Sequence, residues 1–107
     1  MISTHILDTS RGLPATDVKV RLEKREGTKW IEVKAGLTNS DGRFAFDCEL
    51  TPATYQISFE IEKYFEKEKR AFFFMNNSVV FKVEDIARKY HVPLLLSPFG
   101  FSTYRGS

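Results

Sequence analysis

The residues best suited to acid–base chemistry are the two histidines, His5 and His91, which lie near opposite ends of the chain. An unperturbed imidazole titrates near pH 6.5, so either ring can accept or release a proton at neutral pH. Both histidines fall in alternating segments that predict β-strands, and Arg43 begins a third such segment, on the face opposite to the apolar Phe44. All three polar side chains are therefore expected to point away from the core. Exposed structural residues show the same pattern, so the pattern by itself leaves a catalytic and a structural role open.

Other kinds of site find little support in the residues. Cys48 is the only cysteine, which excludes an intramolecular disulfide and a zinc site with two or more thiolates. The segment Leu37–Gly42 partly resembles a calcium loop, but Leu37 would take the first ligand position and Cys48 the twelfth. The Asp41-Gly42 pair instead predicts a hairpin turn. The chain carries no glycine-rich phosphate loop, no nucleophile elbow and no His-Glu-x-x-His motif. We therefore expect no bound metal and no cofactor.

The elements that must position these residues are strands. Apolar and polar residues alternate with a period of two along most of the chain, which is typical of strands with one buried face. Turn signals such as Gly12-Leu13-Pro14 and Glu26-Gly27 separate the segments. Between Glu60 and Arg70 the apolar spacing becomes helical, and Glu66 and Arg70 lie one turn apart, where they could pair. The sequence predicts an all-β antiparallel sandwich with one short α-helix and with strands near residues 2–8, 18–23, 31–34, 44–49, 54–61, 79–83, 91–97 and 100–105.

The strand predicted at His91-Val92-Pro93-Leu94-Leu95-Leu96 is apolar on both faces. In a small sandwich one face of such a strand meets the core, and the other is expected to meet a partner subunit. Pro93 has no N–H to donate to a ladder, so we expect it at an edge or a bulge of the sheet. This strand therefore predicts an association surface.

Length and charge narrow the class of protein. A chain of 107 residues is expected to form a single domain over 1–107, too small to enclose a deep pocket, so that a site would form at a subunit interface. The net charge of +2 argues against nucleic-acid binding, which needs several basic groups on one face. No apolar run is long enough to span a membrane, and residues after Met1 do not form a secretory signal. We therefore expect no membrane or nucleic-acid partner and a cytoplasmic location.

Several motifs occur together and in order along nearly the whole chain. They are Ile2–Asp8 (ISTHILD), Gly12–Ala15 (GLPA), Gly36–Arg43 (GLTNSDGR), His91–Pro98 (HVPLLLSP) and the final Tyr104-Arg105-Gly106-Ser107. With these motifs the sequence resembles the 5-hydroxyisourate hydrolases, the enzymatic branch of the transthyretin-like proteins. The terminal tetrapeptide carries the most weight, because hormone-carrying transthyretins lack it.

The resemblance implies a transthyretin-like fold of two four-stranded sheets with one short helix. It also implies a homotetramer, a dimer of dimers, with active sites at the dimer–dimer interface. The implied reaction is hydrolysis of 5-hydroxyisourate, a product of urate oxidation, to 2-oxo-4-hydroxy-4-carboxy-5-ureidoimidazoline. The alternative is a transthyretin-like carrier that binds a small aromatic ligand in the channel of a tetramer.

The residues that match the family pattern can be given roles. We assign His91 as the general base beside Arg43, and His5 as the group that orients or protonates; the reverse assignment of the two histidines stays open. An arginine near an imidazole disfavours its protonated form, and a guanidinium can bind a developing oxyanion. The implied catalytic residues are His5, Arg43, His91 and Ser107, and the implied substrate-binding residues are Tyr104, Arg105 and Gly106.

One segment departs from the family pattern. The family commonly shows Phe-Phe-Pro-Glu-Val before the strand that here starts near Ser78, whereas this chain has FFFMNNSV over residues 72–79. Loss of that proline and glutamate leaves the local loop and the register of the strand open, without touching the expected catalytic positions.

Overall fold

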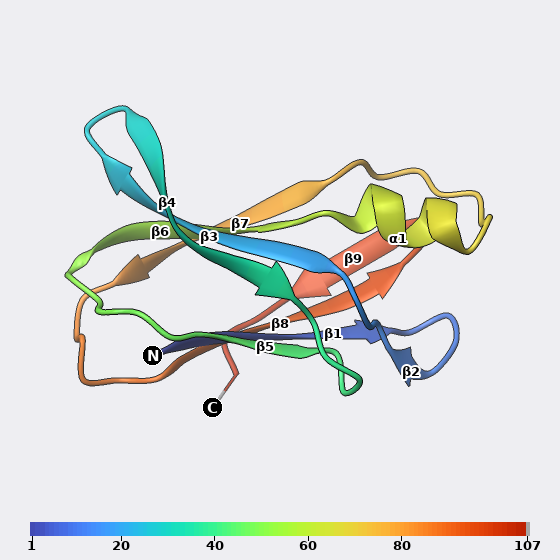
Figure 1. Ribbon diagram of the computed structural model, residues 1–107, viewed down its shortest axis with the longest axis horizontal. Helices are drawn as coiled ribbons and strands as arrows, with labels where there is room; N and C mark the ends of the chain where they lie inside the picture. Colours follow the sequence, from blue (N-terminus) through green and yellow to red (C-terminus); the bar gives the residue numbers. More distant parts are fainter. Residues whose placement is uncertain (107) are drawn as a thin grey trace.

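The protein is a sandwich of two β-sheets with one short helix at one end, as seen in a computed structural model that describes residues 1–106 (Figure 1). No helix within these residues is long and apolar enough to cross a membrane. The elements in chain order are β1 (Ile2–Asp8), β2 (Leu13–Pro14), β3 (Lys19–Glu26), β4 (Lys29–Leu37), β5 (Arg43–Phe46), β6 (Ala53–Phe59), α1 (Ile61–Lys67), β7 (Asn77–Val83), β8 (Tyr90–Ser97) and β9 (Gly100–Thr103).

The two sheets differ slightly from the expected pair of four-stranded sheets. One has four strands in the order β4-β3-β6-β7, as expected. The other has five, in the order β2-β1-β8-β9 with β5 also paired to β1. Strands β5 and β2 share one edge position, because β5 pairs with residues 2–5 of β1 and β2 pairs with residues 7–8. A strand of two residues is too short to show alternation, which is why Leu13–Pro14 was predicted as a turn.

One strand pair corrects the expectation of a fully antiparallel sandwich. Strands β1 and β8 run parallel, with Ile2 opposite Tyr90 and Asp8 opposite Leu96. Alternation has a period of two in either strand direction, so the sequence pattern does not report orientation. Between β1 and β8 the chain forms all four strands of the other sheet. It then returns, so that β8 lies beside β1 and runs in the same direction (Figure 1).

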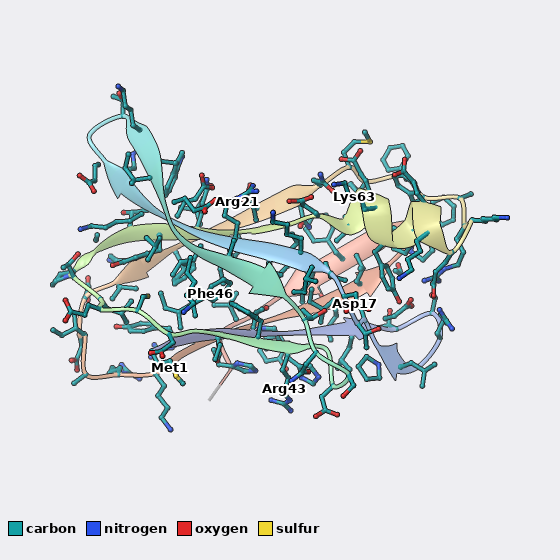
Figure 2. The ribbon with its side chains drawn as sticks, viewed as in Figure 1. Met1, Asp17, Arg21, Arg43, Phe46 and Lys63 are labelled. Atoms are coloured by element: carbon teal, nitrogen blue, oxygen red, sulfur yellow. The ribbon has the colours of Figure 1, made fainter. Side chains whose placement is uncertain are left out.

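The core lies between the sheets and takes alternate residues from each strand. Figure 2 shows the principle on β5, where Phe46 points into the space between the sheets and Arg43 points out of the sandwich. Burying a large apolar side chain contributes about 1.5–3 kcal/mol, so the alternation strongly fixes which face of each strand is outward. The largest fully buried side chains are Tyr55, Phe46, Phe59, Phe65, Ile2, Ile6, Leu22, Ile57, Ile61, Leu94, Leu96 and Val18.

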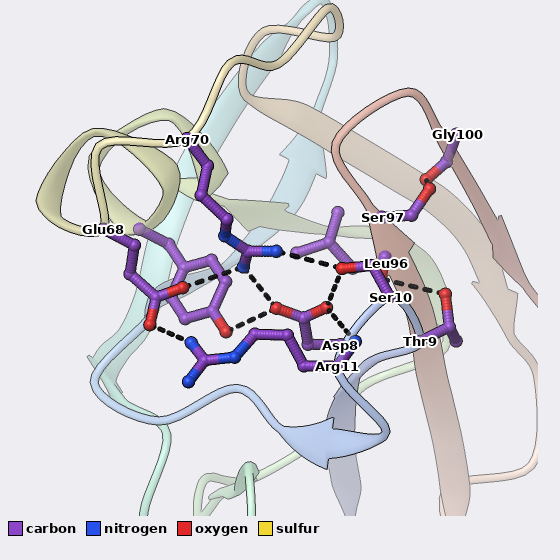
Figure 3. A network of polar contacts seen from close by, with 10 residues as sticks. Asp8, Thr9, Ser10, Arg11, Glu68, Arg70, Leu96, Ser97 and Gly100 are labelled. Carbon is purple, nitrogen blue, oxygen red and sulfur yellow. Dashed lines mark hydrogen bonds and ion pairs between the residues drawn. The ribbon is translucent and has the colours of Figure 1, made fainter.

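A polar network joins helix α1 to the end of β1 (Figure 3). The Asp8 carboxylate is fully buried and accepts hydrogen bonds from Ser10 (2.6 Å), Tyr64 (2.8 Å) and the Arg70 guanidinium. Arg70 also pairs with Glu68 at 2.8 Å. The expected pair of Arg70 with Glu66 is therefore replaced by these contacts. Burial alone would raise the pKa of the Asp8 carboxyl, but its hydrogen bonds hold that pKa below the usual value.

The segment that departs from the family pattern lies in extended coil before β7. Its backbone is tied to the β8–β9 turn, because the Phe73 N–H donates to the Pro98 carbonyl at 2.8 Å. The Asn76 side chain accepts a hydrogen bond from the Glu62 N–H at 3.0 Å, and the Glu62 carboxylate accepts one from the Asn76 N–H at 2.7 Å. Strand β7 then pairs antiparallel with β6 over its full length, with Asn77 opposite Phe59.

The end of β9 is shaped by Pro93. Strand β9 pairs with β8 as far as Thr103, which lies opposite Leu94, and a further bridge joins Gly106 to His91. At this register Tyr104 lies opposite Pro93, which has no N–H to donate, so the ladder is interrupted there. The Thr103 hydroxyl instead donates to the Pro93 carbonyl at 2.7 Å. Pro93 thus occupies a strand with neighbours on both sides, and the expectation of an edge position is wrong.

Candidate active site

Three neighbouring strands bring His5, Arg43 and His91 to the outward face of the five-stranded sheet. Arg43 on β5 lies directly opposite His5 on β1, and His91 on β8 lies opposite Ser3, two residues before His5. Opposite residues on one face have Cβ atoms about 4.5–5.5 Å apart, so the three side chains share one surface. They line an open concavity of about 610 Å³, whose further lining residues are Met1, Ser3, Thr4, Phe44, Ala45, Lys89, Tyr104 and Gly106.

A tight turn before β5 places Arg43 beside His5. Gly42 has a φ of +74°, which L side chains rarely adopt, and a Cβ there would lie 2.5 Å from the Ile6 carbonyl oxygen. The Asn39 side-chain oxygen accepts hydrogen bonds from the N–H groups of Asp41 and Arg43, at 2.9 and 3.0 Å. The predicted turn at residues 39–42 is confirmed, but the expectation of a hairpin is wrong, because β4 and β5 lie in different sheets. The turn carries the chain from one sheet to the other and places the Arg43 guanidinium in the site.

Burial and the Arg43 charge lower the pKa of His5 below its ordinary value of 6.5. A hydrogen bond to the Asp41 backbone and the Asp41 carboxylate act in the opposite direction without reversing the shift. The pKa of His91 is also lowered, first by burial, then by the charges of Arg43 and His5. Both rings are therefore neutral at pH 7 and can accept a proton.

The ring of His91 is held by its neighbours. Its Nδ1 lies 2.8 Å from the Ser3 hydroxyl, within hydrogen-bond distance. The chain end returns over the ring, where the Gly106 N–H donates to the His91 carbonyl at 2.8 Å. A Cβ at Gly106 would lie 2.6 Å from the His91 Cδ2 atom, so only glycine fits against this imidazole.

The terminal motif divides between two places. Tyr104 and Gly106 line the concavity with the histidines. The Arg105 guanidinium instead lies over the Tyr90 ring, 5.3 Å from its centroid, and lines two neighbouring hollows. Ser107 lies outside the described residues.

Six lining residues were not assigned to the site from the sequence, and they include Ser3, Met1 and Lys89. Ser3 had a usable signal, because it shares the outward face of the first strand with His5. Lys89 and Met1 had none, since they reach the concavity only through the pairing of β1 with β8. The Met1 amino group donates to the Arg88 carbonyl at 3.3 Å, next to Lys89.

The arrangement suits hydrolysis of a polar carbonyl compound. A neutral imidazole can take a proton from water, and a guanidinium can stabilise the oxyanion that forms on the attacked carbonyl. A second neutral imidazole can relay a proton by accepting it on one nitrogen and releasing one from the other.

A model of the HIUase/transthyretin family matches residues 2–106. The chain belongs to this family. Among curated family members, 5-hydroxyisourate hydrolase of Mus musculus is 39% identical over 111 residues, covering 99% of this chain and 94% of the mouse protein. The protein of the same name from Salmonella dublin is 40% identical over 110 residues, covering 100% of this chain and 81% of the relative. Nearly the whole chain is therefore aligned with hydrolases of this family.

Solved structures show that the family fold serves two kinds of protein. Klebsiella pneumoniae 5-hydroxyisourate hydrolase superposes with a TM-score of 0.87 at 35% identity, covering 99% of this chain and 98% of that one. Sea bream transthyretin in complex with thyroxine superposes with a TM-score of 0.93 at 25% identity, covering 98% and 93%. The carrier superposes at least as well as the hydrolase, so the backbone does not separate the two activities. The side chains on the outward face must do so.

Proposed function

We propose that the protein hydrolyses 5-hydroxyisourate. The observation that carries the proposal is the convergence of His5, Arg43 and His91 on one concavity, with the chain end at Gly106 packed on His91. The identity of the proposed substrate comes from the hydrolases of mouse and Salmonella dublin, which are similar to this protein over nearly the whole chain. A carrier that only encloses an apolar ligand has no use for two neutral imidazoles beside a guanidinium.

In the proposed reaction, water adds to an acyl carbon of the six-membered ring. His91 takes one proton from the water as its oxygen bonds to that carbon, and Arg43 stabilises the oxyanion. The carbon–nitrogen bond then breaks, and the neutral His5 ring donates a proton from one nitrogen to the leaving nitrogen as its other nitrogen accepts the proton that His91 took from the water. The product is a ring-opened carboxylate, and no covalent intermediate with the protein is formed. The lowered pKa values of both histidines support a base that is neutral at pH 7.

The remaining residues of the chain end are proposed to hold the substrate. Tyr104 lines the concavity and is more than half exposed, so we propose that its hydroxyl hydrogen-bonds to the substrate. Ser107 follows Gly106 directly, and we propose that its hydroxyl positions water or substrate. Arg105 points toward the neighbouring hollows, so we propose that it contacts substrate only across a subunit boundary.

We propose further that the protein is a homotetramer, a dimer of dimers, with the concavity closed by a facing subunit. The outward face that carries the histidines also carries two half-buried apolar side chains, Leu7 on β1 and Leu95 on β8. Removal of such a face from water favours association. Size-exclusion chromatography with light scattering tests this directly, and a monomer at micromolar concentration contradicts it.

The decay of freshly generated 5-hydroxyisourate, followed by absorbance, tests the activity. We expect the wild-type protein to accelerate the decay, and the His91→Asn and His5→Asn variants to lose about 10²–10⁴-fold in rate. Asparagine keeps a polar side chain without a titratable ring. Wild-type rates in both variants would refute the mechanism. A wild-type protein that binds the substrate without accelerating its decay would instead favour the carrier.

A further inference from the structure

The His91 imidazole is restrained along two of its edges by residues from the two ends of the chain. On one edge its Nδ1 meets the Ser3 hydroxyl at 2.8 Å. On the other, its Cδ2 faces the Gly106 backbone so closely that a methyl group could not stand between them. Within residues 1–106, Nε2 makes no hydrogen bond, and it is the ring nitrogen left for the concavity.

Sheet pairing makes the Ser3 contact a fixed feature of the fold. Ser3 and His91 lie opposite each other in the parallel β1–β8 ladder. The residues next to them, Ile2 on β1 and Val92 on β8, point inward and are buried. A slip of the ladder by one residue would turn these apolar side chains outward, so the register is strongly specified. Ser3 is half-buried, which limits competition from water for its hydroxyl.

We propose that Ser3 is a positioning residue for His91: its hydroxyl accepts a hydrogen bond from Nδ1–H and thereby leaves Nε2 unprotonated and facing the concavity. This inference rests on the proposed hydrolase function for its role in catalysis. The structure supports it through the contact itself, the opposite register, and the Gly106 backbone that prevents the ring from turning away.

A hydroxyl suits this position for a chemical reason. When Nε2 takes a proton from water, the imidazolium still carries the Nδ1–H that donates to Ser3, so this bond persists while only the Nε2 proton moves. A carboxylate in the same place would stabilise the protonated ring and retain its proton. The Ser3 hydroxyl orients the ring without adding a charge beside it.

The test compares Ser3→Thr with Ser3→Val in the full-length protein. The two replacements have nearly the same shape and both favour strands, so they differ at this site in the hydroxyl. We expect Ser3→Thr to stay near the wild-type kcat and Ser3→Val to lose roughly tenfold in kcat, as for one hydrogen bond, with KM nearly unchanged. In ¹⁵N spectra of the His91 ring, we expect the Nδ1–H form to dominate in the wild type and in Ser3→Thr, and the Nε2–H form to gain population in Ser3→Val.

Equal kcat values for the two variants, or His91 ring-nitrogen shifts that do not respond to Ser3→Val, would overturn the proposal. The ring spectra do not require substrate, so they separate the two levels of inference. A wild-type protein without activity on 5-hydroxyisourate would refute the proposed function. Ring spectra that nonetheless change as expected would still support Ser3 as the partner that sets the His91 tautomer.

Discussion

Replacement of Gly106 by alanine probes the contact between the chain end and His91. The added Cβ would lie 2.6 Å from Cδ2, 3.3 Å from Cγ and 3.4 Å from Cβ of His91. Carbon atoms in favourable contact are about 3.5–4.0 Å apart, so either the imidazole or the terminal segment must move by about 1 Å. Gly106 is not one of the glycines with a positive φ. The effect of the substitution is therefore expected to come from this contact and not from backbone strain.

A displacement of about 1 Å at a catalytic group can lower the rate by about 10²-fold. We expect Gly106→Ala to lose about this much in kcat for 5-hydroxyisourate decay, measured by absorbance. The change lies near the chain end and outside the apolar core, so the free energy of unfolding should change by less than about 0.5 kcal/mol. A large fall in kcat, with an unchanged free energy of unfolding in urea, would indicate that the His91 imidazole has been displaced.

Gly100→Ala is the matched control. A Cβ at Gly100 would meet only the Ser97 hydroxyl oxygen at 3.7 Å, an ordinary contact, and this glycine begins β9, the strand that precedes Gly106. We expect the control to keep wild-type activity. Activity of Gly106→Ala within about threefold of wild type would refute the reasoning, because 2.6 Å leaves no room for an undisturbed ring. An equal loss in Gly100→Ala would also refute it, by showing that an added methyl lowers activity without a contact to His91.

Other outcomes follow from the same geometry. Because the pKa values of His5 and His91 are lowered and the neutral ring is the base, kcat/KM should be level at pH 7 and fall on the acid side with a midpoint below 6.5; a midpoint above 6.5 would contradict this. A few residues added after Ser107 should lower activity strongly in the absorbance assay, while the same residues inserted in the Gly27 hairpin turn should not. Equal activity of these two variants would show that residues near Ser107 are not part of the site. Asp8→Asn should lower the free energy of unfolding in urea by about 3 kcal/mol, as for breaking a buried ion pair, whereas the exposed Glu66→Gln should have little effect; equal stabilities would show that the network contributes nothing. The stabilisation from Asp8, whose pKa is lowered, should be present above about pH 4 and be lost as pH falls further, and Asp8→Asn should remove this acid dependence.

The strands that carry the site could be predicted from local pattern. The alternation around His5 predicted β1 with its observed bounds, and the apolar run after His91 predicted β8 to within one residue. The helical spacing of Ile61 and Phe65 predicted α1, where both side chains are buried. These features depend on neighbours within a few residues, so they are written directly in the sequence.

Contacts between distant segments could not be read in this way. The buried network of Asp8 uses Tyr64 and Arg70, which lie 56 and 62 residues further along the chain. The sequence suggested instead the local pair of Arg70 with Glu66, because local spacing is the only geometry that a helix pattern supplies. The position of Arg105 over the Tyr90 ring likewise joins residues that lie 15 positions apart, and no local pattern reports it.

The sequence by itself determined which side chains face outward, and its ordered motifs pointed to the family to which the chain belongs. The tertiary structure alone decided that β1 and β8 run parallel, which places Ser3 against His91 although 88 residues separate them. It also decided that the chain end returns over the imidazole, where only glycine fits. The physical reason is that a period of two is the same in both strand directions, so the order and direction of strands are set only when the whole core packs.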